Sequence, residues 1–201
     1  MNLKKIKEKI LRFWDFIWNG KSLSSYIAFL VFSAVFLPLV WKLFLFILGF
    51  FGIVDITAIL TPSMVHGSNI QTTYYSWLSE NGFKEEEYSK WFSPNGFNPG
   101  DAIILKKVSS PFDINVGDVI AFISYQNGPQ IIHRVVEKKC SETECIYSTK
   151  GDNNLYKLAF EKEINSNQIT GKSLLLIPFI GIPRMALYYL MSMAGFGYVL
   201  S

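Results

Sequence analysis

Three polar residues far apart in the chain offer the groups that nucleophilic catalysis needs. Ser63 supplies a hydroxyl, and His133 supplies an imidazole, a base that in its unperturbed form titrates near neutral pH. Asp152 supplies a carboxylate that could hold one tautomer of the imidazole. These residue types point to acyl transfer through a serine nucleophile, provided that the fold brings them together.

The position of Ser63 is unusual for a structural hydroxyl. It follows a long apolar stretch, so we expect it where the chain leaves a membrane. A hydroxyl that merely ends a helix is the alternative. Pro62 fixes its own φ and pushes Thr61 toward extended geometry, so we expect Ser63 to lie outside any helix.

The chain has two histidines, and either could act as a base. His133 shares a strand face with Ile131 and Val135, which also fits a buried, hydrogen-bonded core histidine. His66 lies three residues after Ser63 and stays a candidate for that reason. Adjacent flexible side chains, however, seldom supply a fixed base geometry, so His133 is the preferred candidate.

The two cysteines, Cys140 and Cys145, suit the tip of a hairpin. Two thiols are too few for a structural zinc site, and this spacing is no redox motif. A disulfide would fit an oxidising compartment. If Cys140 faces Cys145, an unbroken antiparallel register puts His133 opposite Asp152, close enough for the carboxylate to orient the imidazole. A bulge, or Gly151, would break that register.

Short β-rich runs bounded by turn residues predict a small, mainly β, antiparallel domain over residues 57–183. Asn127-Gly128 is a hairpin signal between two of these runs. The predicted strands are 102–107, 119–124, 131–138, 146–150 and 169–177.

Residues 68–99 form a partly helical insertion in this domain, with helical spacing around residues 74–78 and 85–92. Its aromatic side chains could pack as an ordinary core against the β-domain, which we favour, or dock the domain on a lipid interface. The aromatic residues are Tyr74, Tyr75, Trp77, Trp91 and Phe92.

The N-terminal part of the chain predicts a membrane anchor. Residues 1–20 read as a cytoplasmic amphipathic arm, and residues 21–56 as a transmembrane segment. The apolar run Tyr26–Val54 would be about 43 Å long as a helix against a hydrocarbon core of roughly 30 Å, so one tilted or kinked crossing is expected. A cleavable signal peptide is the rival interpretation, but the apolar run is longer than such peptides need.

The distribution of charge along the chain supports a cytoplasmic N-terminus and argues against nucleic acid as a partner. Residues 1–21 carry six basic side chains against two acidic ones, whereas the rest of the chain carries 13 basic and 14 acidic ones. The positive-inside rule places the N-terminus in the cytoplasm and the β-domain outside it. No basic surface for nucleic acid is predicted on the folded part.

The C-terminal segment, residues 184–201, is apolar. If helical, residues 185–200 would be about 24 Å long, which is short for a membrane span. The sequence leaves two alternatives open, a second membrane helix or an amphipathic surface helix.

Several short motifs in a fixed order resemble the type I signal peptidases. Histidine rather than lysine before Arg134 is similar to the archaeal and endoplasmic-reticulum branch of that family. The resemblance covers most of residues 60–183. In chain order the motifs are Thr61-Pro62-Ser63-Met64, Gly100-Asp101-Ala102-Ile103-Ile104, Gly117-Asp118-Val119-Ile120, Ile132-His133-Arg134-Val135-Val136, Thr149-Lys150-Gly151-Asp152-Asn153-Asn154, Ile169-Thr170-Gly171-Lys172 and Ile177-Pro178-Phe179-Ile180-Gly181.

The resemblance implies a signal-peptidase type of β-domain and a membrane-bound serine endopeptidase that removes signal peptides from secreted preproteins. It implies Ser63 as nucleophile, His133 as general base and Asp152 as the supporting acid, with no metal or organic cofactor. A lysine base of the bacterial kind would instead use Lys106 or Lys107. The implied substrates are preproteins with signal peptides. The implied partners are membrane lipid and, as a candidate, the protein translocation machinery. The implied location is the cell membrane, or the endoplasmic-reticulum membrane in a eukaryote.

The chain also departs from the family pattern. Val65-His66 stands where the family usually has a residue and then proline, and residues 68–99 replace a short link. The second aspartate of the branch, some six residues after Asp152, is replaced by Leu158. The alternative function is therefore a catalytically inactive, peptidase-like membrane subunit that binds preproteins or partner proteins.

Overall fold

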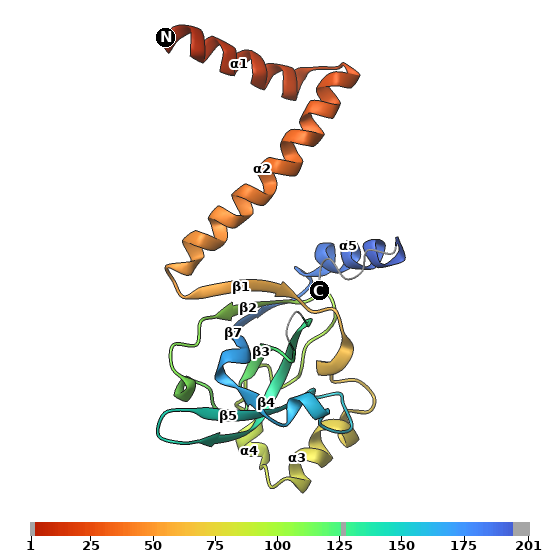
Figure 1. Cartoon of the computed structure of the whole chain (residues 1–201). Coiled ribbons are helices and arrows are strands. Elements are labelled where there is room, and N and C mark those ends of the chain that lie inside the picture. Colours follow the sequence, from red (N-terminus) through yellow and green to blue (C-terminus); the bar gives the residue numbers. More distant parts are fainter. Residues whose placement is uncertain (1–2, 126–127, 195–201) are drawn as a thin grey trace. The chain divides into compact units, whose positions relative to one another are not determined.

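The computed structural model describes residues 3–125 and 128–194, and the chain divides after Phe50 into two compact units (Figure 1). The first unit holds helices α1 (Leu3–Asn19) and α2 (Leu23–Gly49). Helix α1 corresponds to the expected N-terminal arm. Ser22 caps α2, because its side chain accepts a hydrogen bond from the Ser25 amide at 3.2 Å.

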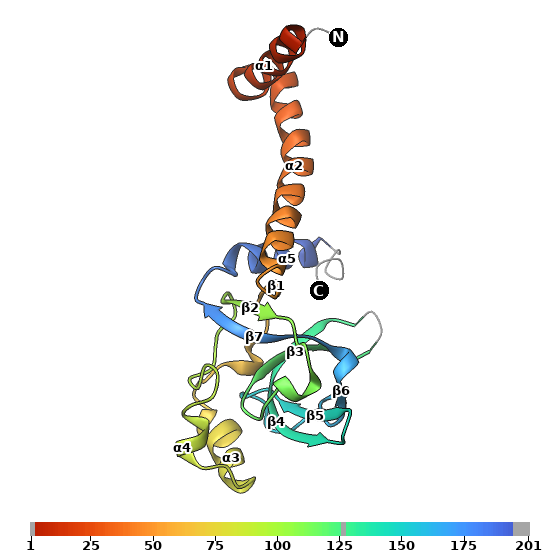
Figure 2. The ribbon, with the colours of Figure 1, turned by 90° about the vertical axis from the view of Figure 1, so that its left-hand side faces the viewer.

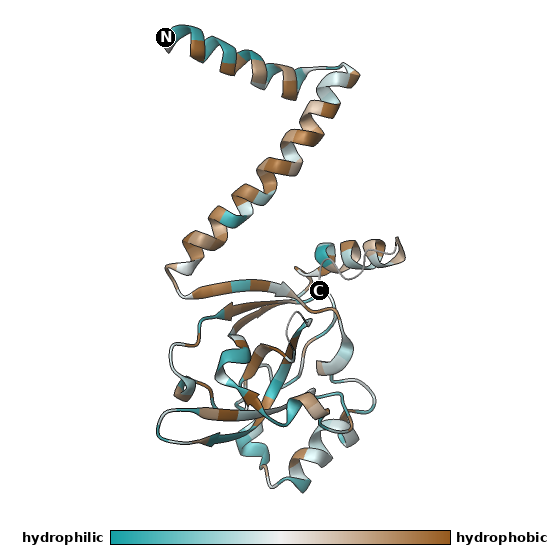
Figure 3. Cartoon of the chain, viewed as in Figure 1, coloured by the Kyte–Doolittle hydropathy of each residue, from teal (hydrophilic) through white to brown (hydrophobic). Residues whose placement is uncertain are grey.

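Helix α2 is apolar along its length, with Lys42 as its interruption (Figure 3). Among the described residues it is the one helix long and apolar enough to cross a membrane, and a signal sequence near an N-terminus has the same properties. The helix ends at Gly49, earlier than the expected boundary at residue 56. Gly52, at φ +76°, turns the chain, and the β-branched residues that follow pair as a strand instead.

The second unit is built on one antiparallel sheet of seven strands in the order β1-β2-β7-β3-β4-β5-β6. All five predicted strands are present, and β1 and β6 are additional. The expectation of a mainly β protein holds for this sheet alone, since about 43% of the described residues are helical. The strands are β1 (Ile53–Ala58), β2 (Ala102–Lys106), β3 (Val119–Ile123), β4 (Gln130–Cys140), β5 (Cys145–Lys150), β6 (Ile164–Asn165) and β7 (Ile169–Ile177). Asn127 of the predicted hairpin turn lies outside the described residues.

The two Gly-Asp motifs are two turns of the same construction. Gly100 and Gly117 each have φ +92°, which a residue with a side chain rarely adopts. Asp101 and Asp118 each accept a hydrogen bond from the backbone amide three residues earlier, at 2.8 and 2.7 Å. Each turn therefore starts a core strand, β2 or β3.

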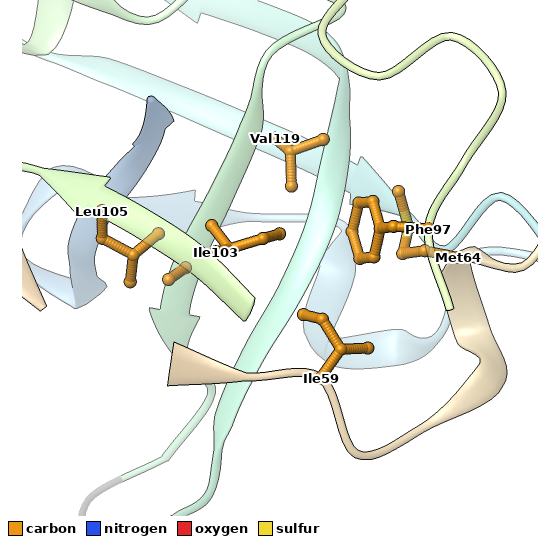
Figure 4. Packing of buried hydrophobic residues seen from close by; sticks show 7 residues of the cluster. Ile59, Met64, Phe97, Ile103, Leu105 and Val119 are labelled. Atoms are coloured by element: carbon orange, nitrogen blue, oxygen red, sulfur yellow. The ribbon is translucent and has the colours of Figure 1, made fainter. Parts of the chain in front are cut away.

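The core of the sheet reaches the segment that carries Ser63. Met64 and Phe97 lie side by side against Ile59, Ile103 and Val119, and all five are almost fully buried (Figure 4). Burial of large apolar side chains of this kind stabilises the fold by about 1.5–3 kcal/mol each. The core thus holds the residue that directly follows Ser63.

The insertion contains a π-helical turn, η2 (Gln71–Ser76), and helices α3 (Trp77–Glu80) and α4 (Glu85–Tyr88). Its aromatic rings pack against one another, and Arg134 of the sheet lies 5.6 Å from the ring centroid of Tyr74 and 5.8 Å from that of Trp91. This arrangement is the packed core expected for the insertion, stabilised in part by cation–π contacts.

Helix α5 (Ile182–Met193) follows β7 and contacts β1. The two views of the second unit place α5 at one end and the insertion helices α3 and α4 at the other (Figure 2). The 12 residues of α5 are too few to cross a bilayer, since they span about 18 Å. Residues 195–201 of the expected C-terminal segment lie outside the described residues.

Candidate active site

Ser63 lies in a single 3-10 turn, η1 (Pro62–Met64), directly after β1 and its extension. Thr61 is extended, with φ −117° and ψ 152°, as the following proline predicted. The expectation that Ser63 lies outside any helix is wrong in detail, because proline suits the first position of such a turn. Met64 anchors the turn in the core, so the half-buried Ser63 side chain keeps a defined place.

The segment after β5 is bonded to this turn through its backbone and side chains. The Asn153 amide donates to the Ser63 carbonyl oxygen at 2.8 Å, and Asn153 Nδ2 donates to the Pro62 carbonyl oxygen at 3.1 Å. The Asp152 amide points at Met64 Sδ, 3.3 Å away. Asp152 and Asn153, which follow β5, therefore hold the turn that carries Ser63.

Gly151 is the point at which the serine turn and the histidine meet. A Cβ atom at this position would lie 2.6 Å from Asn154 Nδ2 and 2.9 Å from both His133 Nε2 and the Ser63 carbonyl oxygen. Contacts that short do not occur for real side chains, so only glycine allows this approach. The Ser63 backbone and the His133 imidazole therefore both lie beside Gly151.

Ser63 and His133 also line one cavity of about 650 Å³, here called the Ser63 cavity. Its walls come from the end of β1, the start of β4 and helix α5, and they are largely apolar. Apolar wall residues include Ile59, Leu60, Ile131, Ile132 and Phe160.

The predicted disulfide is present, but the register derived from it is wrong near the site. Cys140 and Cys145 are bonded at the tip of the β4–β5 hairpin and pair directly. Val136 is an extra residue in β4, because Val135 pairs with Thr149 while the next paired residue, Glu137, faces Ser148. This bulge shifts the register by one residue, so the position opposite His133 is that of Gly151 and not of Asp152.

The carboxylate that orients His133 is Glu161. Its Oε1 lies 2.5 Å from His133 Nδ1, and its Oε2 accepts the backbone amide of Leu158 at 2.7 Å. Glu161 is fully buried in the 3-10 turn η4 (Ala159–Glu161). An ionised carboxylate can only accept, so in the neutral imidazole that it binds the lone pair lies on Nε2, which faces Gly151.

Asp152 has a different set of partners from the one predicted. Its two oxygens accept from Arg134 Nε at 2.9 Å and Arg134 Nη2 at 2.7 Å, and His66 Nε2 lies 3.0 Å from Oδ2. Burial would raise the pKa of Asp152, but the Arg134 charge and the hydrogen bonds from His66 and Arg134 outweigh it and lower that pKa. Asp152 is therefore the buried counter-charge of Arg134.

Arg134 links this counter-charge to the insertion. Nη1 and Nη2 donate to the carbonyl oxygens of Phe92 at 2.7 Å and Ser93 at 3.1 Å. His66 belongs to the same buried group, packed against Gly96 and the ring of Tyr74, and it does not line the Ser63 cavity.

Among the residues that the structure describes, no lysine lines the Ser63 cavity. Lys106 and Lys107, the candidates for a lysine base, do not line it. Burial lowers the pKa of a third lysine, Lys150, to about 8. Its ammonium donates to the carbonyl oxygens of Thr73 and Gly151 and lies 5.1 Å from the ring centroid of Trp77, and Lys150 does not line the Ser63 cavity.

The Ser63 hydroxyl is hydrogen-bonded to Thr61 Oγ1 at 3.3 Å, and no hydrogen bond joins it to His133 among the described residues. Catalytic hydrogen bonds of this kind are often long before substrate binds. Within residues 3–125 and 128–194, no group of three His, Cys, Asp or Glu side chains is arranged to hold a metal ion.

Glu161 is the residue that sequence reasoning missed. The available signal was its nearness to the expected second acid, since it follows Leu158 by three residues. Nothing local distinguishes it from the neighbouring exposed Glu163, because only packing shows which acid is buried. No protein-family model matches the chain, and no curated protein matches it either.

Proposed function

We propose that this protein is a membrane-anchored serine endopeptidase that removes signal peptides from preproteins. The observation that carries the proposal is that Ser63 and His133 line one cavity, with the Ser63 backbone and His133 Nε2 both beside Gly151 and the buried Glu161 holding His133 Nδ1. These residues supply the nucleophile, the base and the orienting acid that acyl transfer needs, which supports the proposal.

The chemistry proceeds in two steps. Ser63 Oγ attacks the scissile carbonyl carbon and forms an ester bond, while its proton passes to His133 Nε2. The C–N bond breaks, and the leaving amine takes that proton from Nε2. Water then attacks the ester carbonyl carbon while one of its protons passes to Nε2, the bond between that carbon and Ser63 Oγ breaks, and Oγ takes the proton back from Nε2 as the acid is released. Glu161 stabilises the imidazolium in both steps without becoming protonated.

The resemblance to the histidine branch of the type I signal peptidases supports the same proposal. The branch usually carries a second acid about six residues after the aspartate of the Gly-Asp-Asn-Asn motif. Leu158 occupies that position here, and Glu161 supplies a buried acid one short turn later. The missing second aspartate was the main reason to consider an inactive subunit. Because Glu161 supplies an acid in its place, we favour the active enzyme.

The anchor gives the proposed enzyme its location. Helix α2 directly precedes β1, so the catalytic unit is tethered to the membrane if α2 spans it. The basic residues before α2 favour a cytoplasmic N-terminus and an extracytoplasmic catalytic unit. A signal sequence emerging from the same bilayer would then be a substrate held on the same membrane as the enzyme.

The test is cleavage of a purified preprotein by the full chain in detergent. We expect cleavage at one site, complete loss of it in Ser63→Ala, and retention of it in Ser68→Ala, a matched change at an exposed serine. A serine-reactive phosphonate should label the unmodified chain at Ser63. Binding of the preprotein without cleavage or labelling would instead identify the non-catalytic subunit.

A further inference from the structure

A second cavity adjoins the Ser63 cavity on the side of the insertion. It also measures about 650 Å³ and lies between η2 and residues 153–158. Asn154 and Leu158 line both cavities, so the two are neighbours across these residues. We call it the amide cavity, because Asn69, Asn153 and Asn154 line it together with Thr72 and Thr73.

The amide cavity differs in character from the Ser63 cavity. None of its lining residues is charged, and side chains that can both donate and accept hydrogen bonds predominate. The side-chain amides of Asn69 and Asn154 and the Thr72 hydroxyl make no hydrogen bond to any other residue that the structure describes. These groups are free to bind a ligand with neutral donors and acceptors, such as a peptide backbone.

The chemistry of the cut determines which side of a substrate could reach this cavity. The leaving amine must lie next to His133 Nε2, because it takes its proton there. Asn154 Nδ2 and His133 Nε2 both lie beside Gly151, and Asn154 also lines the amide cavity. Helix α5, which also lines the Ser63 cavity, lies at the end of the second unit opposite the insertion.

We propose that the amide cavity binds the polypeptide that follows the scissile bond, through its backbone and neutral polar side chains. Asn69 and Thr72 are then specificity residues for the first residues of the released protein, and the insertion supplies a binding site absent from a domain with a short link. This inference rests on the proposed function, since it assigns the two cavities to the two sides of one cleaved bond.

Two peptide substrates test the inference with the full chain in detergent. Both carry the same apolar segment and small residues before the scissile bond. One ends in a coumarin amide as the leaving group, and the other continues as a tail of serine, glutamine and threonine. The rates are compared between the unmodified chain, the double variant Asn69→Ala with Thr72→Val, and the control Gln71→Ala. All three positions are exposed, and Gln71 does not line the amide cavity.

We expect the double variant to lose about tenfold in kcat/KM for the tailed peptide and to keep its rate for the coumarin amide. Gln71→Ala should leave both rates unchanged. Equal losses for both peptides, or no loss for the tailed peptide, would overturn the inference while leaving the proposed function intact. If the unmodified chain cleaves neither peptide, nor a preprotein, both proposals fail.

Discussion

Glu161 Oε1 and His133 Nδ1 lie 2.5 Å apart in a buried contact between two segments 28 residues apart in the chain. His133 comes from the inner part of β4, whereas Glu161 ends a 3-10 turn after β5. Thr149 Oγ1 donates to the same carboxylate oxygen at 3.4 Å. These hydrogen bonds fix the orientation of the carboxylate, so in the proposed mechanism it is preorganised to stabilise the charge that develops on His133.

Replacing Glu161 by Gln should lower kcat on the order of 10³-fold with little change in KM. The glutamine amide can donate to Nδ1, which favours the wrong imidazole tautomer and cannot stabilise the imidazolium. Steady-state kinetics on a peptide substrate would measure the loss. Glu163→Gln is the matched control, because Glu163 is exposed. Equal activity of the two variants would remove Glu161 from the mechanism.

The two histidines should respond differently to removal. His133→Ala should reduce turnover by several orders of magnitude, whereas His66→Ala should reduce it by at most about tenfold. The reason is that His66 Nε2 is engaged by Asp152 outside the Ser63 cavity. Turnover of both variants, normalised to the folded fraction, distinguishes them. The reverse order would make His66 the base.

Gly151→Ala should reduce kcat about 100-fold or more. Its methyl group would push His133 Nε2 away from the backbone of Ser63, since both lie 2.9 Å from the new atom. The control is Gly67→Ala, whose methyl group would meet only Val65 Cγ1, at an ordinary 3.8 Å. Kinetics and thermal unfolding of both variants separate a displaced site from a destabilised fold. Normal turnover in Gly151→Ala would contradict the close approach described above.

Asp152→Asn should destabilise the fold. It leaves the Arg134 charge buried without its partner, which costs about 3–5 kcal/mol. The structure also predicts a pH dependence. The pKa of Asp152 is lowered from 3.8 in the folded state, so its contribution is complete above that value and is lost as pH falls further.

Chemical denaturation of the full chain between pH 7 and pH 2.5 would measure both effects. The unmodified chain should lose free energy of unfolding below about pH 4, and Asp152→Asn should lose less over the same range. Asp113→Asn, at an exposed carboxylate, serves as the control. Parallel acid profiles for all three proteins would show that Asp152 is not the buried counter-charge.

The sequence by itself determined the local elements. Apolar periodicity and turn residues located α1, α2 and five strands, because these signals depend on neighbours within a few residues. The sequence also predicted the disulfide between Cys140 and Cys145 and identified Ser63 and His133 as candidate site residues. Strand β1 was not, since its apolar residues continue the composition of α2 and only pairing with β2 distinguishes them.

Only the tertiary structure decided which acid serves which base. One extra residue, Val136, shifts the β4–β5 register and separates His133 from Asp152, and no local pattern marks such a bulge. The two buried carboxylates, those of Asp152 and Glu161, then bind different partners. Asp152 lies between Arg134 and His66, and Glu161 reaches His133 through the packing of a short turn. Contacts of this kind depend on long-range packing, because each joins segments that are distant in sequence and individually unremarkable in composition.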